Sequence, residues 1–224
     1  MSDRVDHSKP GLGDPERRRR PGRPAAGRDV RAALLESARR CFSAEPYTSV
    51  TLRQIATLVG VNPAMVAYYF GSKLGLYEAM LDEAVATIGA ALAELTRAPE
   101  PDIERFLSTY METLGEYPWL PPLLARDVFG AEGPMRDVFV RRLAERGAVR
   151  LPAALRRLQL KGRLRPGLDP SLTMLNLISL GLLPFLARPV AETVLGVRYD
   201  SIGRRRLIAN TLAVLRTGMI VDGK

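Results

Sequence analysis

The sequence predicts an all-α fold, and three observations lead to it. Apolar residues recur at intervals of three and four through most of the chain after residue 28, which is the period of helices with one buried face. Several of these segments begin on a helix-capping residue and end at glycine or proline. With 224 residues, 46% of them hydrophobic and 25% charged, the chain can also bury a substantial core, as one large domain or two small ones.

The clearest helical signal lies in the first third of the chain. Thr51 precedes Gln54 by the three residues of a capping box, which predicts the start of a short helix. Gly60 supplies a left-handed residue to end it, and Pro63 begins a second helix that reaches Phe70. This pattern predicts a helix-turn-helix, whose second helix can lie in the major groove of DNA. The same spacing also fits a plain helical hairpin within a bundle.

The segments before this pair complete a small unit. Residues 1–28 are rich in proline, glycine and charge and have no helical or strand period, so we expect a disordered basic arm. Its arginines are suited to the minor groove of DNA, although a solvated tail that raises only non-specific affinity is the alternative. Residues 29–43 carry one apolar face, from Val30 to Phe42, and predict the first of three helices.

The remaining apolar segments predict a second helical region. The expected helices cover residues 72–96, 102–117, 121–129, 134–161, 172–186, 189–196 and 201–220. Gly75 leaves the first of them without a closed capping box and is either a hinge or a tolerated glycine. Gly147 and Pro152 are expected to kink or break the helix at 134–161.

Two stretches of this region have an unusual composition. Residues 134–166 are strongly basic, which fits a solvated face or, alternatively, attraction for an anionic effector or a second contact with DNA. Residues 172–186 are apolar nearly all round, which implies burial on more than one side. This run is short of the roughly 20 residues that a membrane helix needs, so no membrane partner is expected.

Charge and residue usage exclude other classes of protein. The net charge of +9 favours a polyanionic partner. Cys41 is the single cysteine, so no intramolecular disulfide is possible; together with the lack of an N-terminal apolar signal segment, this favours a cytoplasmic location. The single histidine, His7, lies in the arm, and no nucleophile elbow, phosphate loop or Cys/His cluster is present. We therefore expect no catalytic residues, no metal site, no cofactor and no enzymatic activity.

Three strings in the helix-turn-helix carry a family resemblance. Thr-x-Arg-x-Ile-Ala begins at Thr51, Gly-Val-Asn-Pro-Ala follows at Gly60, and Tyr-Tyr-Phe-Gly-Ser-Lys ends at Lys73. Over about residues 28–80 the chain resembles the N-terminal domain of TetR/AcrR-type transcriptional repressors. The resemblance implies a DNA-binding domain at residues 28–75 after a basic arm at 1–27, and a helical effector-binding and dimerisation domain at 76–224.

The resemblance also implies which residues contact DNA. The expected contacts are Thr51, Arg53, Asn62, Pro63, Ala64, Met65, Ala67, Tyr68, Tyr69 and Lys73, with Arg20 and Arg23 of the arm. Two positions depart from the family: Ala67 stands where tyrosine is common, and Met65 where threonine or serine is common. The recognition helix therefore offers few hydrogen-bond donors to base edges, and Arg53, the tyrosines and the arm are expected to supply more of the specificity. For Phe70 a structural role is preferred.

Further expectations concern the partners of the second region. The effector would be an apolar or amphipathic small molecule, and the candidate pocket residues are Phe106, Tyr110, Met111, Tyr117, Trp119, Leu123, Leu124, Phe129 and Phe139, which at this spacing are also compatible with plain core. The expected homodimer interface is formed by Leu175, Ile178, Leu182, Ile208, Leu212, Leu215 and Met219. Such a homodimer would bind an inverted repeat in double-stranded DNA and leave it when the effector binds. The alternatives are a DNA-binding activator without small-molecule control, or a helical adaptor module.

Overall fold

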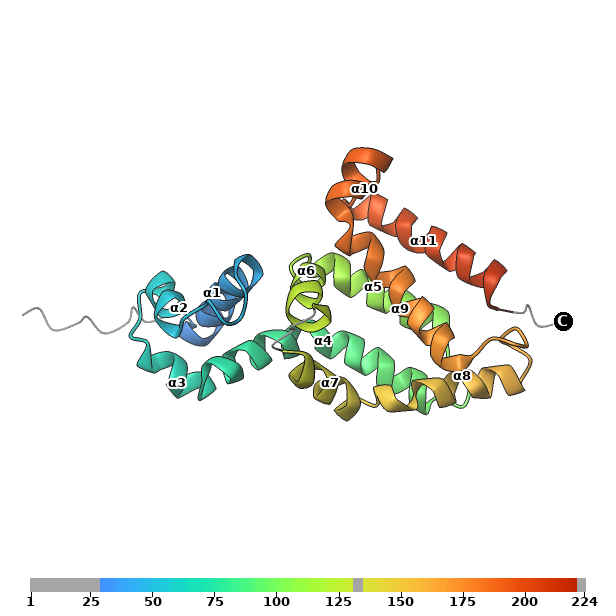
Figure 1. The fold of residues 1–224 in the computed structure, drawn as a ribbon, viewed down its shortest axis with the longest axis horizontal. Coiled ribbons are helices and arrows are strands. Elements are labelled where there is room, and N and C mark those ends of the chain that lie inside the picture. Colours follow the sequence, from blue (N-terminus) through green and yellow to red (C-terminus); the bar gives the residue numbers. More distant parts are fainter. Residues whose placement is uncertain (1–28, 131–134, 221–224) are drawn as a thin grey trace, which may run out of the picture.

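A computed structural model describes residues 29–130 and 135–220, and this part of the chain is almost entirely helical (Figure 1). The elements are α1 (Val30–Ala44), α2 (Leu52–Val59), α3 (Ala64–Phe70), α4 (Lys73–Arg97), α5 (Ile103–Glu116), α6 (Leu120–Leu124), the π-helix η1 (Ala125–Phe129), α7 (Arg136–Glu145), the 3-10 helix η2 (Ala148–Arg150), α8 (Leu151–Leu160), α9 (Pro170–Leu186), α10 (Arg188–Leu195) and α11 (Ser201–Gly218). The all-α prediction is confirmed. Beyond the helices, the described residues pair only in one isolated antiparallel bridge, between Leu164 and Ile220.

Helices α1, α2 and α3 form a small unit at one end of the molecule, and α4 leads from it into a larger bundle (Figure 1). The small unit is held by side chains that have no solvent exposure, including Leu34, Phe42, Ile55 and Val66. α1 supplies the predicted apolar face, and α2 and α3 each contribute the few residues that point away from solvent. A compact three-helix unit thus precedes the long helix.

The predicted turn chemistry is present. The Thr51 hydroxyl accepts from the Gln54 amide at 3.2 Å, and the Gln54 side chain accepts from the Thr51 amide at 2.7 Å, so the capping box is closed. Gly60 ends α2 with φ of 76°, a left-handed conformation that costs glycine little. Asn62 accepts from the Ala64 amide at 2.9 Å and so caps the first turn of α3.

The larger bundle is built around α4, α5, α8 and α9. α5 packs against α4, α9 and α11, and α8 packs against α4 and α9. The predicted break in residues 134–161 is confirmed: Gly147, with φ of 93°, separates α7 from the short η2 and α8. The predicted helix at 121–129 is α6 continued as η1, where the hydrogen-bond ring widens by one residue.

The basic stretch from residue 134 to 166 has a structural use that the sequence alone did not indicate. Arg142 pairs with Glu78 at 3.0 Å and Arg146 pairs with Asp82 at 2.8 Å, which fastens α7 to α4. Arg157 donates to the carbonyl of Thr96 at 2.8 Å, at the C-terminal end of α4. These three arginines are therefore occupied in packing the bundle.

No single helix within the described ranges has both the length and the hydropathy to cross a bilayer; α9 and α10 pass that test only as a pair, across a 70° bend.

Candidate nucleic-acid interface

Most residues of α3, the second helix of the helix-turn-helix, are exposed to solvent. Val66 is the one residue of α3 that is buried, and it anchors the helix to the core of the small unit. Tyr68 is 78% exposed and Tyr69 is 37% exposed, with their rings 5.0 Å apart in an edge-to-face arrangement. Two adjacent exposed aromatic side chains make this face a candidate surface for contact with a partner.

The expected contact positions on α3 have the exposure that contact requires. Of these, Pro63, Ala64, Ala67, Tyr68 and Tyr69 are exposed, while Met65 is half-buried. Phe70 is half-buried, and the guanidinium of Arg31 lies 5.3 Å from the centre of its ring. The structural role preferred for Phe70 is consistent with this packing.

The expected contacts on α2 and in the turn divide into free and occupied side chains. Arg53 is exposed, and the described residues hold no hydrogen bond or ion pair to its guanidinium. The Thr51 hydroxyl is occupied, since it donates to the Gln54 side chain at 2.8 Å and accepts from the Gln54 amide. The side-chain carbonyl oxygen of Asn62 accepts the hydrogen bond that caps α3, and its side-chain N–H groups remain available as donors. Arg53 is thus the most available cation on this helix.

Lys73, at the first position of α4, is held beside the helix-turn-helix by an aromatic ring. Its ammonium lies 4.4 Å from the centre of the Tyr47 ring, a cation–π contact. Partial burial lowers the pKa of Lys73 from its ordinary value. The contact holds this charge at the start of α4, close to the end of α3.

The joint between α3 and α4 depends on two glycines. Gly71 has φ of 74° and ψ of −46°, and the Ser72 amide donates to the Phe70 carbonyl at 2.8 Å across this tight turn. A Cβ on Gly75 would lie 2.1 Å from the Phe70 carbonyl oxygen. Gly75 is therefore not merely tolerated: the end of α3 and the first turn of α4 approach so closely that a side chain does not fit. The arm residues Arg20 and Arg23 lie outside the described residues.

The candidate effector residues are mostly packed as core. Phe106, Tyr110, Met111, Leu123 and Leu124 are buried, and the Phe106 and Tyr110 rings stack 6.1 Å apart. Phe129 is 56% exposed at the end of η1, so its side chain lines no interior space, which corrects the expectation for this residue. Tyr117 and Trp119 border a surface groove of about 440 Å³ between α1 and the end of α5, while Phe139 is half-buried against the core.

The candidate dimer residues are unevenly exposed. Leu175 is 59% exposed, and Ile178, Ile208, Leu212 and Met219 are half-buried. Leu182 and Leu215 are 8% and 0% exposed, so they pack inside the chain and correct the expectation of a surface role. Other apolar residues at least half-exposed on α9, α10 and α11 are Leu172, Leu183, Val190, Val194, Leu195, Ile202 and Val214.

Comparison with known proteins identifies the small unit. Residues 34–80 match the family model described as bacterial regulatory proteins, tetR family. This segment is similar to the helix-turn-helix domain of the tetR family. A segment of 88 residues is 34% identical to the HTH-type transcriptional repressor NicS of Pseudomonas putida, covering 39% of this chain and 41% of NicS. The tetR-family match therefore spans less than half the length of that curated relative.

Solved structures extend the likeness in fold over most of this chain. The ketosteroid transcriptional regulator KstR2 of Mycobacterium tuberculosis superposes with a TM-score of 0.65 at 15% identity, over 86% of this chain and 95% of KstR2. SmeT in complex with triclosan superposes with a TM-score of 0.61 at 19% identity, over 88% of this chain and 94% of SmeT. SmeT is the repressor of a multidrug efflux pump of Stenotrophomonas maltophilia. At these identities the likeness shows a shared fold.

Sequence reasoning missed a polar cluster at the joint between the two parts. Asp127 is fully buried, Arg126 pairs with it at 2.8 Å, and the Tyr77 hydroxyl donates to it at 3.3 Å. One signal was available: an adjacent cation and anion interrupt the apolar run that follows Trp119. A buried carboxylate needs partners, and their identity required the tertiary structure. Among the described residues, no three His, Cys, Asp or Glu side chains come together as a metal site.

Proposed function

We propose that this chain is a homodimeric transcriptional repressor that binds an inverted repeat in double-stranded DNA and leaves it when a small molecule binds. One observation carries the proposal: α3 lies beyond a left-handed glycine turn with only Val66 buried and with both tyrosines exposed. A second helix presented in this way can enter the major groove with its side chains directed at base edges. In this assignment residues 28–75 bind DNA, residues 76–224 bind the effector and dimerise, and residues 1–27 form the basic arm.

The proposed assignment of side chains to bases and phosphates of DNA follows from which side chains have no partner among the described residues. Arg53 and the Tyr68 hydroxyl are available for base edges, and Pro63, Ala64, Met65 and Ala67 offer apolar contact to thymine methyl groups. Asn62 and Tyr69 supply further polar contacts. Lys73 and the N-terminal end of α2 at Thr51 would hold phosphates, with Arg20 and Arg23 in the minor groove. The protein would thus read sequence with few hydrogen bonds.

Dimerisation is supported by the apolar surface of the last three helices. Leu172, Leu175 and Leu183 are each about 60% exposed on α9. Val190, Val194 and Leu195 continue this apolar surface on α10, at 61%, 71% and 73%. Contiguous exposed leucine and valine mark a surface that is covered in the working assembly. We assign that cover to the same surface of a second copy, which would place two α3 helices on one duplex.

Release by a small molecule is proposed from the fold likeness to SmeT, which forms a complex with triclosan. In this chain an apolar molecule would have to displace the stacked rings of Phe106 and Tyr110 to enter the bundle between α5 and α9. The space there is tight, because a Cβ on Gly181 would lie 2.7 Å from the Tyr110 ring. Trp119 is the single tryptophan and lies on the adjacent turn, so its fluorescence can report binding of triclosan as a probe.

The proposal is tested by selecting duplexes from a library with a randomised core, using the full-length protein. We expect an enriched inverted repeat, bound far more tightly than a duplex of shuffled sequence. Enrichment of no sequence would contradict the proposal and favour a helical adaptor. Specific binding that triclosan and other apolar probes leave unchanged would favour a DNA-binding regulator without small-molecule control.

A further inference from the structure

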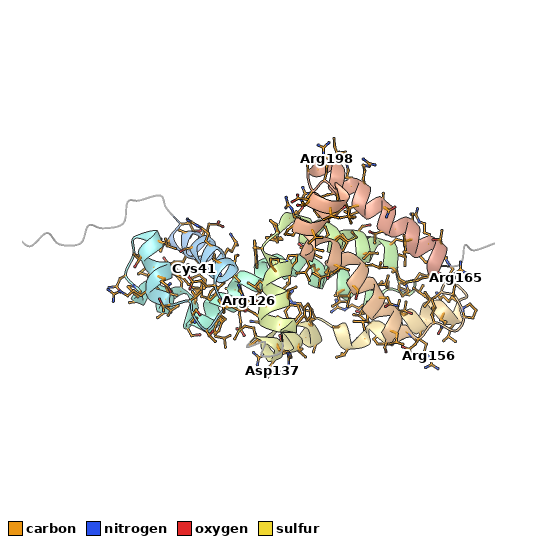
Figure 2. All side chains as sticks on the ribbon, turned by 45° about the horizontal axis from the view of Figure 1, so that its top comes forward. Cys41, Arg126, Asp137, Arg156, Arg165 and Arg198 are labelled. Atoms are coloured by element: carbon orange, nitrogen blue, oxygen red, sulfur yellow. The ribbon has the colours of Figure 1, made fainter. Side chains whose placement is uncertain are left out.

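We propose that Arg126 is a positioning residue for DNA binding: with Asp127 and Tyr77 it fixes the orientation of α1, and with it the helix-turn-helix, against the C-terminal bundle. The inference rests on the proposed function, because its consequence is measured on DNA. Figure 2 places Arg126 at the junction between the small unit and the bundle. The group is called here the Arg126 latch, and it consists of Arg126, Asp127 and Tyr77.

The latch engages α1 at carbonyl groups that the helix itself leaves unpaired. α1 ends at Ala44, so the carbonyls of Phe42 and Ser43 lie in its last turn. The amide that would continue the ladder to Phe42 belongs to Pro46, which has no N–H. The Arg126 guanidinium supplies the missing donors, at 2.5 Å to the Phe42 carbonyl and 3.4 Å to the Ser43 carbonyl. A cation at this end of a helix also interacts favourably with the helix dipole.

Asp127 fixes the orientation of the guanidinium from the other side. Arg126 donates to the two Asp127 carboxylate oxygens at 2.8 and 3.1 Å, a two-point contact that sets the plane of the guanidinium. The bond to Asp127 raises the pKa of Arg126 from its ordinary value. Because Asp127 is fully buried, loss of Arg126 would leave a carboxylate without its counter-charge inside the protein. The pair therefore strongly favours one arrangement of η1 against α1.

Tyr77 connects the same carboxylate to α4. Its hydroxyl donates to Asp127 at 3.3 Å, and burial, followed by the charge of Asp127, raises the pKa of Tyr77. Its ring meets Phe42 edge-on at 5.0 Å and Tyr47 edge-on at 5.2 Å. Tyr47 in turn lies under the Lys73 ammonium. Contacts thus run without interruption from η1 to Lys73 at the start of α4, next to the recognition helix.

The two adjacent charged residues, Arg126 and Asp127, both lie in the π-helical η1, where Arg126 reaches α1 and Asp127 reaches Tyr77. Asp127 is fully buried while Arg126 is 30% exposed at its side chain, and both act on the junction. η1 is held at its far end by the Met135 amide, which donates to the Asp127 carbonyl at 3.0 Å, and by Arg136, which donates to the Val128 carbonyl at 3.2 Å. π-helical turns often occur at functional sites, and here the turn aims a salt bridge at another domain.

A fixed direction of α1 matters for a dimer on an inverted repeat. The two recognition helices must be separated by one helical turn of DNA, or a multiple, to reach both half-sites together. A rigid junction selects one half-site spacing, whereas a loose junction accepts several and loses entropy on binding. The Arg126 latch is therefore predicted to act on specific affinity and on spacing preference, and to leave non-specific binding unchanged.

The test compares variants on three duplexes: the one selected by the wild-type protein, the same duplex with two base pairs inserted between the half-sites, and a shuffled duplex. Arg126→Ala is expected to lose about tenfold or more in affinity for the selected duplex, the scale of a charge-assisted hydrogen bond. It should also weaken the penalty for the insertion and bind the shuffled duplex as the wild type does. Arg126→Lys, which keeps the charge but not the two-point geometry, should restore affinity only in part.

A matched control is Arg157→Ala. Arg157 also caps the carbonyl end of a helix, donating to Thr96 and Ala98 at 2.8 and 3.3 Å, but both partners lie within the bundle. This variant should lose thermal stability and keep the wild-type affinity and spacing preference. If Arg126→Ala is poorly folded by circular dichroism, Tyr77→Phe removes one hydroxyl and should shift spacing preference in the same direction, by a few fold.

The outcomes separate the two proposals. If the wild-type protein enriches no duplex, the proposed function fails before the latch is tested. If the wild type binds specifically and Arg126→Ala keeps both its affinity and its spacing preference, or binds more tightly, the latch is overturned. Equal effects of Arg157→Ala and Arg126→Ala on spacing would also overturn it, because the effect would then be one of general stability.

Discussion

The helix-turn-helix and the last three helices both expose large side chains, but of different chemistry. α3 exposes tyrosines whose hydroxyls can still form hydrogen bonds, and α2 exposes the unpaired cation of Arg53. α9, α10 and α11 expose leucine, isoleucine and valine, which have no polar group to offer. The first surface suits a hydrated polyanion and the second suits an apolar surface of the same kind. The chain therefore has one exposed surface with groups that can form hydrogen bonds and another that is apolar.

The two surfaces are also connected differently to their supports. α3 joins α4 through a turn in which Gly71 has a positive φ of 74° and Gly75 leaves no room for a side chain, and the Arg126 latch ties α1 to η1. α10, in contrast, is bent by 70° from α9 and projects from the bundle with most of its surface open (Figure 1). The helix-turn-helix unit is thus held by polar contacts and a tight turn, while the apolar surface is exposed in the single chain and is proposed to be covered by a second copy.

The largest expected effect comes from breaking the apolar surface. Leu175→Arg places a charge at the centre of the proposed dimer contact and should give a monomer by light scattering. Affinity for the selected duplex should fall roughly a hundredfold or more, since linking two binding units contributes factors of this size. Leu160→Arg is the matched control, because Leu160 is 81% exposed on α8, outside the last three helices. A Leu175→Arg protein that remains dimeric would contradict the assignment.

Gly75→Ala tests the rigid joint between α3 and α4. A methyl group there would overlap the Phe70 carbonyl oxygen, so unfolding in urea should show a loss of about 1–3 kcal/mol. Gly218→Ala provides the control, because nothing lies within 4 Å of a Cβ added at that helical position and the change should be neutral or stabilising. If Gly75→Ala is as stable as the wild type, the joint is looser than the structure indicates.

Arg53→Ala sharpens the description of the DNA-facing surface. If Arg53 reads a base, the variant should lose about 1–3 kcal/mol of binding free energy and relax the preference at one position of the selected site. A loss that is equal on all sequences would reassign Arg53 to a phosphate. Arg40→Ala removes the same charge from the groove beside Glu116 and Trp119 and should leave base preference unchanged.

Lys73→Gln should have the smallest effect. If the Lys73 ammonium neutralises one phosphate, the slope of log affinity against log salt should decrease by about 0.9. The loss should be uniform over DNA sequences, and the helical content should remain that of the wild type. An unchanged slope would mean that the contact with Tyr47 is the whole role of this lysine.

The sequence predicted the local elements well and the long-range contacts poorly. The capping box at Thr51, the left-handed Gly60 and the break at Gly147 follow from short-range rules, and the structure confirms all three. Leu182 and Leu215 were assigned to a surface because helical periodicity gives a face without saying which neighbour covers it. Periodicity has the same limit at Phe129, which lies at the end of the π-helical η1 and is 56% exposed.

The polar contacts between the two parts could not be read from the sequence. Arg126 and Phe42 are 84 residues apart, and nothing local indicates that one caps the helix of the other. The basic stretch after residue 134 shows the same point, since its arginines pair with Glu78 and Asp82 on a helix far earlier in the chain. Charge composition predicted an anionic partner, and for these side chains the partner is the protein itself.

The central claim is that two copies of this chain place two α3 helices on one inverted repeat. Sedimentation velocity of the full-length protein with the selected duplex tests it most directly, at a salt concentration where shuffled DNA is not bound. We predict two chains per duplex, with half-sites about 10 base pairs apart or a multiple of that distance. One chain per duplex, or a selected site without two-fold symmetry, would contradict the account.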